Sequence, residues 1–261
     1  MWRSPAIAAA LFLGSLVLAA SAQSPAPVAG GKRAGSVFLT PELRAQQEDE
    51  GTNPGMLWVT AGEKLWTAPA PGGNACATCH GDAASSMNGV AARYPLVDAS
   101  TGKFLNLELR INQCRVERQG EAALAYESDP LLGLTAYVAF QSRGVPLNVD
   151  VDGPARPYFE AGRDLFAARQ GQLNLSCAQC HDENWGRRLR GDIISQGHPT
   201  GFPVYRLEWQ TAGSLHRRLK VCSQGVRAEP YDPASPEHLA LELYLAWRAK
   251  DLPIDTPAIR R

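Results

Sequence analysis

The chain has 261 residues, and its 26 Lys and Arg are balanced by 26 Asp and Glu, which gives a formal net charge of zero. A neutral chain lacks the overall positive charge that favours binding to nucleic acid, so no nucleic-acid partner is expected. The length suits two small domains better than a single large one. Six cysteines are present, and their spacing is the most informative pattern in the sequence.

The N-terminus has the order of a secretory signal. Arg3 is followed by an apolar run over residues 6–20 and by the small residues Ala20-Ser21-Ala22. This pattern predicts a cleaved signal peptide over residues 1–22, a mature chain that begins near Gln23, and export to the periplasm. The run is short for a membrane helix, and no later stretch is long and apolar enough, so no membrane span is expected. A retained N-terminal anchor is the alternative.

The next segment, residues 23–56, is polar and rich in Gly, Pro and charged residues. A segment of this composition contributes little to a hydrophobic core. We therefore predict an extended N-terminal arm that docks on a partner or on another part of the chain.

One cysteine motif is present in two copies. The motif C-x-x-C-H occurs as Cys76-Ala77-Thr78-Cys79-His80 and as Cys177-Ala178-Gln179-Cys180-His181. It is the attachment signature of c-type haem, in which the two sulfurs form thioethers with the porphyrin and the His supplies one iron ligand. A structural zinc site is the competing interpretation, but zinc does not require a His directly after each second Cys. The sequence therefore predicts two covalently bound haem c groups.

The residues around the two motifs are also repeated. Residues 61–66 correspond to residues 161–166, and residues 137–147 correspond to residues 244–254 at an offset of 107. A repeat of this size indicates an internal duplication in which each copy encloses its own haem. We predict two tandem cytochrome c-like domains, residues 57–150 and residues 151–261, with the boundary where Gly153 and Pro154 break any helix.

Within both predicted domains the apolar residues follow a helical spacing, and strand patterns are almost absent. The helix faces consist of Leu132, Ala136 and Phe140 in the first domain and of Leu239, Leu243 and Trp247 in the second. Asp129-Pro130 and Ser235-Pro236 are predicted to begin these helices, because a side-chain oxygen before a proline suits a helix N-terminus. We expect these faces to pack against the haem and the fold class to be all-α.

The second iron ligand of each haem is predicted to be a cysteine. Cytochrome c domains often use Met, but after the signal only Met56 and Met87 remain, and both lie in the first half. The first half also contains no His besides His80. Cys114 and Cys222 occupy equivalent positions of the repeat, so we expect both to ligate iron as thiolates and to lower the reduction potential relative to Met.

Other ligand assignments remain open at this stage. An exported chain with two spare cysteines can join Cys114 and Cys222 in one interdomain disulfide. Met87 is an alternative ligand for the first haem, although it follows His80 closely. For the second haem the alternatives are His198, His216 and His238.

The region around Cys222 is strongly basic within a neutral chain. The basic residues are Arg187, Arg188, Arg190, Arg206, Arg217, Arg218, Lys220 and Arg227, and the acidic residues are Asp192 and Glu208. Such a local field favours a small anion or an acidic partner surface. If residues 211–222 are helical, Arg218 lies one turn before Cys222 and can bind an oxyanion beside the sulfur. Arg110 holds the same place before Cys114, so the alternative is that both arginines pair with haem propionates.

The two cysteines differ in the residues that follow them. Cys114 precedes the bulky residues 115–118, whereas Cys222 precedes Ser223-Gln224-Gly225, which leaves more space beside the sulfur. We therefore expect a closed first site that transfers electrons and an open second site that reacts with substrate.

At these residues the chain resembles the SoxA family, whose members are subunits of the SoxAX cytochrome in the bacterial thiosulfate-oxidising Sox system. The resemblance rests on the signal, the two haem motifs, Cys114 within residues 110–115, and Cys222 followed by residues 227–231, and it extends from about residue 57 onward. Because Cys76, Cys79 and His80 are all present, it resembles a dihaem member.

The resemblance implies an L-cysteine S-thiosulfotransferase that couples thiosulfate oxidatively to a cysteine of a carrier protein. It also implies a SoxX-like monohaem cytochrome c as partner, a SoxY-like carrier as acceptor, a persulfide at Cys222 and a substrate-binding role for Arg218. We hypothesise that Arg227 or Arg248 assists substrate binding, and that the electrons pass to a further cytochrome c. The alternatives are a non-catalytic dihaem electron carrier and a dihaem peroxidase.

Overall fold

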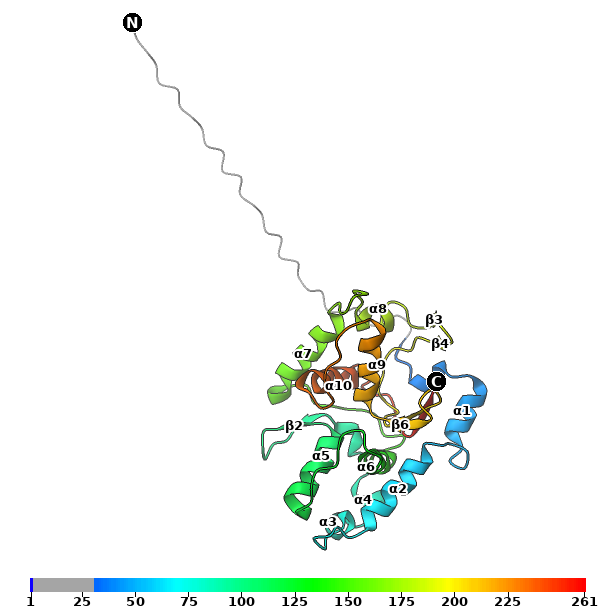
Figure 1. Cartoon of the computed structure of the whole chain (residues 1–261), viewed down its shortest axis with the longest axis vertical. Helices are drawn as coiled ribbons and strands as arrows, with labels where there is room; N and C mark the ends of the chain where they lie inside the picture. The colour runs from blue at the N-terminus through cyan, green and yellow to red at the C-terminus, as the bar shows by residue number, and fades with distance from the viewer. Residues whose placement is uncertain (2–30) are drawn as a thin grey trace. The chain divides into compact units, whose positions relative to one another are not determined.

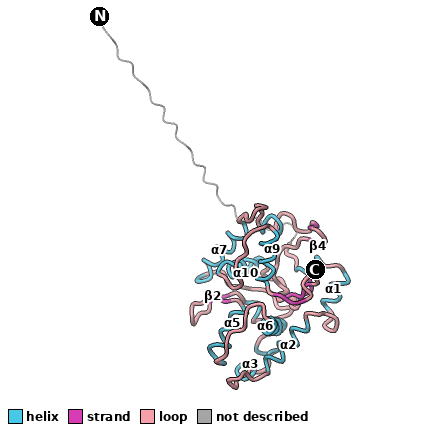
Figure 2. The backbone as a smooth tube through the Cα atoms, viewed as in Figure 1, coloured by secondary structure: helices cyan, strands magenta, loops and turns pink. Residues whose placement is uncertain are grey.

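The computed structural model describes residue 1 and residues 31–261 (Figure 1). Apart from Met1, the predicted signal peptide lies outside the described residues, as does the beginning of the predicted arm. Residues 32–261 are mostly helical, with a few short strands (Figure 2). Among the described residues no helix is both long and apolar enough to cross a membrane.

The helices and strands are short and follow one another closely. The α-helices are α1 (Pro41–Glu48), α2 (Met56–Thr67), α3 (Cys76–His80), α4 (Ala83–Ser86), α5 (Leu107–Cys114), α6 (Asp129–Phe140), α7 (Arg156–Ala167), α8 (Cys177–His181), α9 (Leu215–Gly225) and α10 (Pro236–Arg248). The 3₁₀-helices are η1 (Gly35–Phe38), η2 (Ala91–Arg93) and η4 (Gly153–Ala155), and η3 (Arg115–Gln119) is a short π-helix. The strands are β1 (Leu96–Val97), β2 (Phe104–Leu105), β3 (Arg188–Leu189), β4 (Asp192–Ile193), β5 (Val204–Arg206), β6 (Thr211–Gly213) and β7 (Ala258–Arg260).

Short polar side chains begin several of these helices. The Ser235 hydroxyl accepts a hydrogen bond from the backbone N–H of His238 at 3.2 Å, so the predicted start of α10 is confirmed. The prediction that Asp129 caps α6 is wrong, because the helix begins at Asp129 itself. The Asp129 carboxylate instead accepts a hydrogen bond from Trp58 Nε1 at 3.1 Å. That contact ties the start of α6 to α2.

Each half contains one closely crossed helix pair, α2 with α6 and α7 with α10. At the first crossing a Cβ on Gly62 would collide with the carbonyl oxygen of Gly133. At the second a Cβ on Gly162 would collide with the carbonyl oxygen of Ala240. A side chain at either glycine would therefore push the helices apart, and the two crossings share one packing device at positions 100 residues apart in the sequence.

The two segments that the sequence aligns at an offset of 107 pair with each other. Gly144 N–H donates to the carbonyl oxygen of Ile254 and Leu147 N–H donates to that of Leu252, both at 2.9 Å, and Pro146 opposes Pro253 in an antiparallel bridge. Leu147 and Val149 of the first half belong to a hydrophobic core that also contains buried residues of α7 and α10. Residues of the first half therefore contribute to the core of the second, while a separate apolar cluster around Trp66, Leu107 and Val138 lies within the first half.

The all-α expectation needs correction, because the fold also contains β-structure. Strand β5 lies between β6, to which it is antiparallel, and β7, to which it is parallel, and Tyr205 opposes both Ala212 and Ile259. Two further hairpins pair β1 with β2 and β3 with β4. Strands of two or three residues are too short to produce an alternating pattern in the sequence, so the fold is mostly α rather than all-α.

The described part of the predicted arm is not extended throughout, since it contains α1. Thr40 accepts the backbone N–H of Leu43 at 3.4 Å and Pro41 occupies the first helical turn, which together start this helix. Asn53 is buried, and its side-chain amide donates to the carbonyl oxygen of Pro257 at 2.8 Å. Helix α1 therefore packs beside β7 in the second half of the chain (Figure 1).

Candidate functional site

Both C-x-x-C-H motifs form five-residue helices, α3 and α8. The start of α8 is held by a reciprocal cap, in which Ser176 Oγ accepts the N–H of Gln179 at 3.2 Å and Gln179 Oε1 accepts the N–H of Ser176 at 2.9 Å. At α3, Thr78 Oγ1 accepts the N–H of Ala75 at 3.1 Å. Each motif thus presents two thiols and one imidazole from about one and a half helical turns.

The His181 ring has a defined orientation. Its Nδ1 lies 2.7 Å from the carbonyl oxygen of Ser195, so Nδ1 carries the proton and donates, and Nε2 keeps a lone pair for a metal ion. Burial lowers the pKa of His181 to about 4, and the positive charges of Arg248 and Arg218 act in the same direction. Gly197 leaves room for the His181 ring, because a Cβ at residue 197 would lie only 3.1 Å from His181 Cγ. The ring therefore stays neutral, which is the ligating form.

The two predicted cysteine ligands lie near different motifs. Burial raises the pKa of Cys114, and an electrostatic interaction with Cys79 places this thiol near α3. Burial raises the pKa of Cys177 to about 11, and the next contribution comes from Cys222, which lies near α8. All six cysteines are free, so no disulfide joins Cys114 to Cys222 and that alternative is wrong.

Two of the three alternative histidine ligands have hydrogen-bond partners elsewhere. His216 Nε2 lies 2.9 Å from a Glu242 carboxylate oxygen, and His216 Nδ1 accepts the N–H of Ala234 at 3.0 Å, so both ring nitrogens are engaged. His198 Nδ1 bonds the carbonyl oxygen of Arg33 at 2.8 Å. His238 is buried beside His216, with ring centroids 4.9 Å apart. Met87 packs on the same apolar cluster as Cys76.

The two equivalent arginines differ in their partners. Arg110 forms an ion pair with the buried Asp98, donates from Nε to the Tyr94 hydroxyl at 3.0 Å, and donates from Nη1 to Gln113 at 2.9 Å. The Arg218 side chain makes no hydrogen bond or ion pair with any other residue that the structure describes. Its charge lowers the pKa of His181, which places Arg218 near the second motif. Of these two equivalent arginines, only Arg218 is therefore an uncompensated guanidinium among the described residues.

The other two predicted substrate-binding arginines have separate positions. Arg227 is exposed in the turn after α9, where its carbonyl oxygen accepts the N–H of Gln172 at 3.2 Å. Arg248 is buried, forms an ion pair with Asp182, and lies 4.2 Å above the Phe166 ring. Its Nη1 also donates to the carbonyl oxygen of Gln196 at 3.1 Å. The structure thus brings Arg218 and Cys222 together on α9, whereas Arg248 holds the residue that follows His181.

Helix α9 is shorter at its start than the predicted range of 211–222. Residues 211–213 form β6, and Ser214 then caps α9 by accepting the N–H of Arg217 at 3.2 Å. Arg218 and Cys222 still lie one turn apart on the same helix face. After Cys114, in contrast, the backbone continues directly into the short π-helix η3.

Sequence reasoning did not identify Ser195 or Asp98. Both act from loops, 14 and 12 residues away from their partners His181 and Arg110, and no local pattern indicates such contacts. Asp182 could have been noticed in the sequence, because it directly follows the motif residue His181. The donor set near each motif, one imidazole with two motif thiols and one further thiol, fits a covalently attached haem.

Known proteins with similar sequences decide the family. Residues 61–147 match the family described as SoxA/TsdA, cytochrome c domain. The chain is 41% identical to the L-cysteine S-thiosulfotransferase subunit SoxA of Pseudaminobacter salicylatoxidans, over 87% of this chain and 80% of that protein. It is 38% identical to the protein of the same name from Rhodovulum sulfidophilum, with the same coverage. The chain belongs to the SoxA family.

The fold agrees with SoxA membership. The chain superposes on a chain of the structure titled "Crystal structure of SoxXA from P. pantotrophus" with a TM-score of 0.85 and 37% identity, covering 88% of this chain and 87% of that one. The resemblance inferred from the cysteine motifs is thereby confirmed, and so is a cytochrome c domain over residues 61–147, which implies haem c. This SoxA chain is therefore a haem protein of the thiosulfate-oxidising transferase family.

Proposed function

We propose that this chain is the catalytic subunit of a periplasmic L-cysteine S-thiosulfotransferase with two haem c groups in tandem domains, residues 57–150 and 151–261. The reaction joins the outer sulfur of thiosulfate to a cysteine sulfur of a carrier protein. One S–S bond forms, the carrier thiol releases its proton, and two electrons leave. The names of the relatives, the repeated helix crossings and the two motif helices support this proposal.

The observation that carries the proposal is the difference between Arg218 and Arg110. Thiosulfate is a dianion, and an arginine without an acidic partner provides charge and paired N–H donors for its oxygens. Arg110 is already neutralised by Asp98, whereas Arg218 is not. The second half therefore suits anion binding, and the first half suits electron transfer.

In this proposal the chain's own side chains bind and orient the reactants. Arg218 holds the sulfonate end of thiosulfate, so that the outer sulfur faces Cys222 one turn further along α9. The sulfur atoms that form the new S–S bond react as anions, and a nearby cation favours the anionic form. Arg227 is exposed at the end of the same helix and can contact the entering anion, while Arg248 positions α8 through Asp182.

The haem groups would be held by residues of both motifs. We assign Cys76, Cys79, Cys177 and Cys180 to the thioethers, and His80, Cys114, His181 and Cys222 to the iron atoms. When bound, haem c accepts the electrons released as the sulfur is oxidised. We also propose a SoxX-like monohaem cytochrome c as partner, because the similar solved structure is titled as a SoxXA assembly. A SoxY-like carrier protein as acceptor and a cytochrome c as electron acceptor complete the proposal.

The test compares Cys222→Met with Cys114→Met in the haem-loaded protein together with its partner and carrier proteins. We expect both variants to keep two thioether-bound haems by mass spectrometry. Only Cys222→Met should lose thiosulfate-dependent modification of the carrier cysteine. If Cys222→Met retains full transfer, Cys222 has no catalytic role in the reaction.

A further inference from the structure

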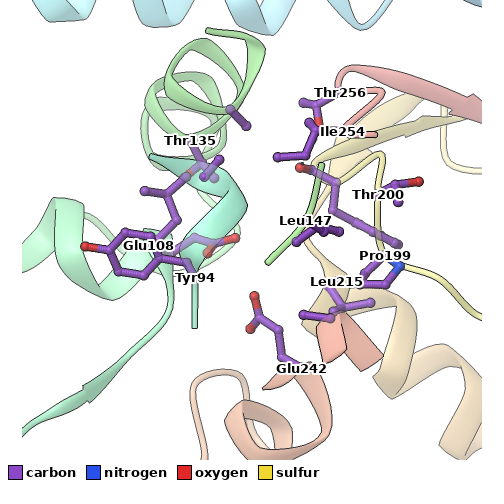
Figure 3. A pocket seen from close by; sticks show the side chains of 15 residues that line it. Tyr94, Glu108, Thr135, Leu147, Pro199, Thr200, Leu215, Glu242, Ile254 and Thr256 are labelled. Carbon is purple, nitrogen blue, oxygen red and sulfur yellow. Dashed lines mark hydrogen bonds between the residues drawn. The ribbon is translucent and has the colours of Figure 1, made fainter. Parts of the chain in front are cut away.

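A cavity of about 70 Å³ lies at the junction of the two halves (Figure 3). Glu108 of α5 reaches it from the first half, and Glu242 of α10 reaches it from the second half. Both carboxyl groups point into the space between them (Figure 3). Neither residue belongs to the haem motifs or to the proposed thiosulfate site, so this inference does not depend on the proposed function.

The surroundings of the two carboxyl groups provide no positive charge. Among the described residues that line the cavity there is no Lys, Arg or His. Tyr94 also lines it, and the nearest cation there, Arg110, bonds the Tyr94 hydroxyl but is paired with Asp98. Two carboxylates facing one another without a cation repel strongly, so one of them retains a proton.

The histidines beside the cavity do not change this conclusion. His216 accepts the N–H of Ala234 at Nδ1, so its single ring proton is on Nε2 and the ring is neutral. Its neighbour His238 is buried, and burial lowers the pKa of His238 to about 4. The remaining titratable neighbours are Glu127 and Tyr126, and neither supplies a positive charge.

Hydrogen bonds decide which carboxyl group is ionised. One Glu242 oxygen accepts from the Asn106 side-chain amide and from His216 Nε2, both at 2.9 Å, which stabilises a carboxylate. Within the described part of the chain the Glu108 carboxyl bonds no other residue, and only the backbone N–H of Glu108 itself interacts with it. Burial raises the pKa of Glu108 to about 8, and the charges of Glu242 and Glu127 raise it further.

Two buried hydroxyl groups at the same cavity also lack partners. Thr135 and Thr200 line it from the two halves, and the Oγ1 atom of each is buried without a hydrogen bond. A polar cavity needs only about 10–15 Å³ for each water molecule, so this one has room for several. Water between these groups would satisfy both hydroxyls and the carboxyl of Glu108.

We propose that Glu108 and Glu242 form a binding site for one proton and a cluster of ordered water between the two halves, with Glu108 as a neutral carboxylic acid at neutral pH. The site connects the starts of two helices. Asn106 caps α5, which ends at Cys114, and His216 lies in the first turn of α9, which carries Cys222. A proton lost from this site therefore places a second negative charge between the two cysteine-bearing helices.

Infrared spectroscopy of the haem-loaded protein tests the protonation state directly. We expect a carbonyl band of a protonated carboxylic acid at pH 7, which disappears as the pH rises through about 8. The band should be absent in Glu108→Gln and unchanged in Glu48→Gln, a control on the exposed side of α1. In Glu242→Gln it should disappear at lower pH, because a repelling charge is removed. A wild-type spectrum without this band at pH 7 overturns the proposal.

The pH dependence of stability provides an independent test. Above the ordinary glutamate pKa of 4.5 the unfolded chain has released the Glu108 proton, whereas the folded protein holds it up to about 8. Stability due to this group therefore falls as pH rises between these values, by up to about tenfold per pH unit in the folding equilibrium constant. Glu108→Gln should remove this fall, and Glu48→Gln should keep it. Equal pH slopes in wild type and Glu108→Gln would contradict the proposal, and a crystal structure with a dry cavity would contradict the water cluster.

Discussion

At the scale of single residues, the environment of a guanidinium matters more than its place in the sequence. Arg110 and Arg218 both stand four residues before a cysteine, and the sequence alone leaves open whether they share one role. The structure separates them, because Asp98, Tyr94 and Gln113 engage Arg110 while Arg218 has no such partners in the described chain. One arginine contributes to stability and the other is available for an anion.

Replacing the two arginines by alanine should therefore affect the free energy of unfolding differently. Arg110→Ala leaves the carboxylate of Asp98 buried without its cation, and we expect the free energy of unfolding to fall by about 2 kcal/mol, somewhat less than for a fully buried pair. Arg218→Ala breaks no such contact, so its unfolding free energy should change by less than about 0.5 kcal/mol. Chemical denaturation of both variants measures this difference.

Kinetics of the same two variants complete the comparison. Arg218→Ala should raise the KM for thiosulfate about tenfold or more, since it removes charged hydrogen bonds to the substrate. Arg110→Ala should leave this KM unchanged at a temperature where it is folded. An unchanged KM in Arg218→Ala would indicate that Arg218 pairs with a haem propionate instead.

The candidate site was predictable from sequence only in part. Arg218 and Cys222 are four residues apart, so a helix places them on one face without any knowledge of the fold. The ion pair of Arg248 with Asp182 joins α10 to the end of α8 across 66 residues, and it becomes visible only when the chain is folded. Local spacing therefore indicated the reacting groups but not the contacts that hold them in place.

At the scale of elements, the main helices of both halves were predictable and the sheet was not. Apolar residues on α6 and α10 recur with the helical period, and Leu132 and Leu243 are indeed buried. Trp247 is the exception on the predicted face, because it remains 39% exposed. The sheet depends on β7, which pairs with β5 from 54 residues further along the chain, and a three-residue strand has no detectable period. Helix α1 was missed as well, because the polar composition of residues 23–56 led to the prediction of an extended arm.

The glycine crossings lead to a prediction about helix packing. In Gly62→Ala and Gly162→Ala the new methyl group meets a backbone carbonyl that cannot rotate away. We expect each variant to lose about 1–3 kcal/mol of unfolding free energy or more, as overpacked cores do. Gly225→Ala is the matched control, since a Cβ there meets nothing within 4 Å, and it should be neutral or slightly stabilising. Thermal unfolding by circular dichroism measures all three, and a neutral Gly162→Ala would contradict the close crossing.

At the scale of the whole molecule, the two halves depend on each other. Helix α1 docks on the second half through Asn53 and then leads into α2 of the first half. Glu127 of the first half accepts the backbone N–H of Ser214 at 3.3 Å, at the start of α9 in the second half. Because of these contacts and of the core residues around Leu147, each half would expose buried groups to solvent if it were separated from the other.

This interdependence predicts that the halves unfold together. Leu132→Ala removes a side chain that is 2% exposed in α6, which should cost about 2–5 kcal/mol. Because Leu147 and Val149 of the first half are part of the core around α10, amide hydrogen exchange by global unfolding should accelerate in α10 as much as in α6. Leu57→Ala, at a side chain that is 69% exposed, should change neither. Exchange that accelerates in α6 alone would show instead that the halves unfold as separate units, and the proposed proton site at their junction would then open whenever the first half unfolds.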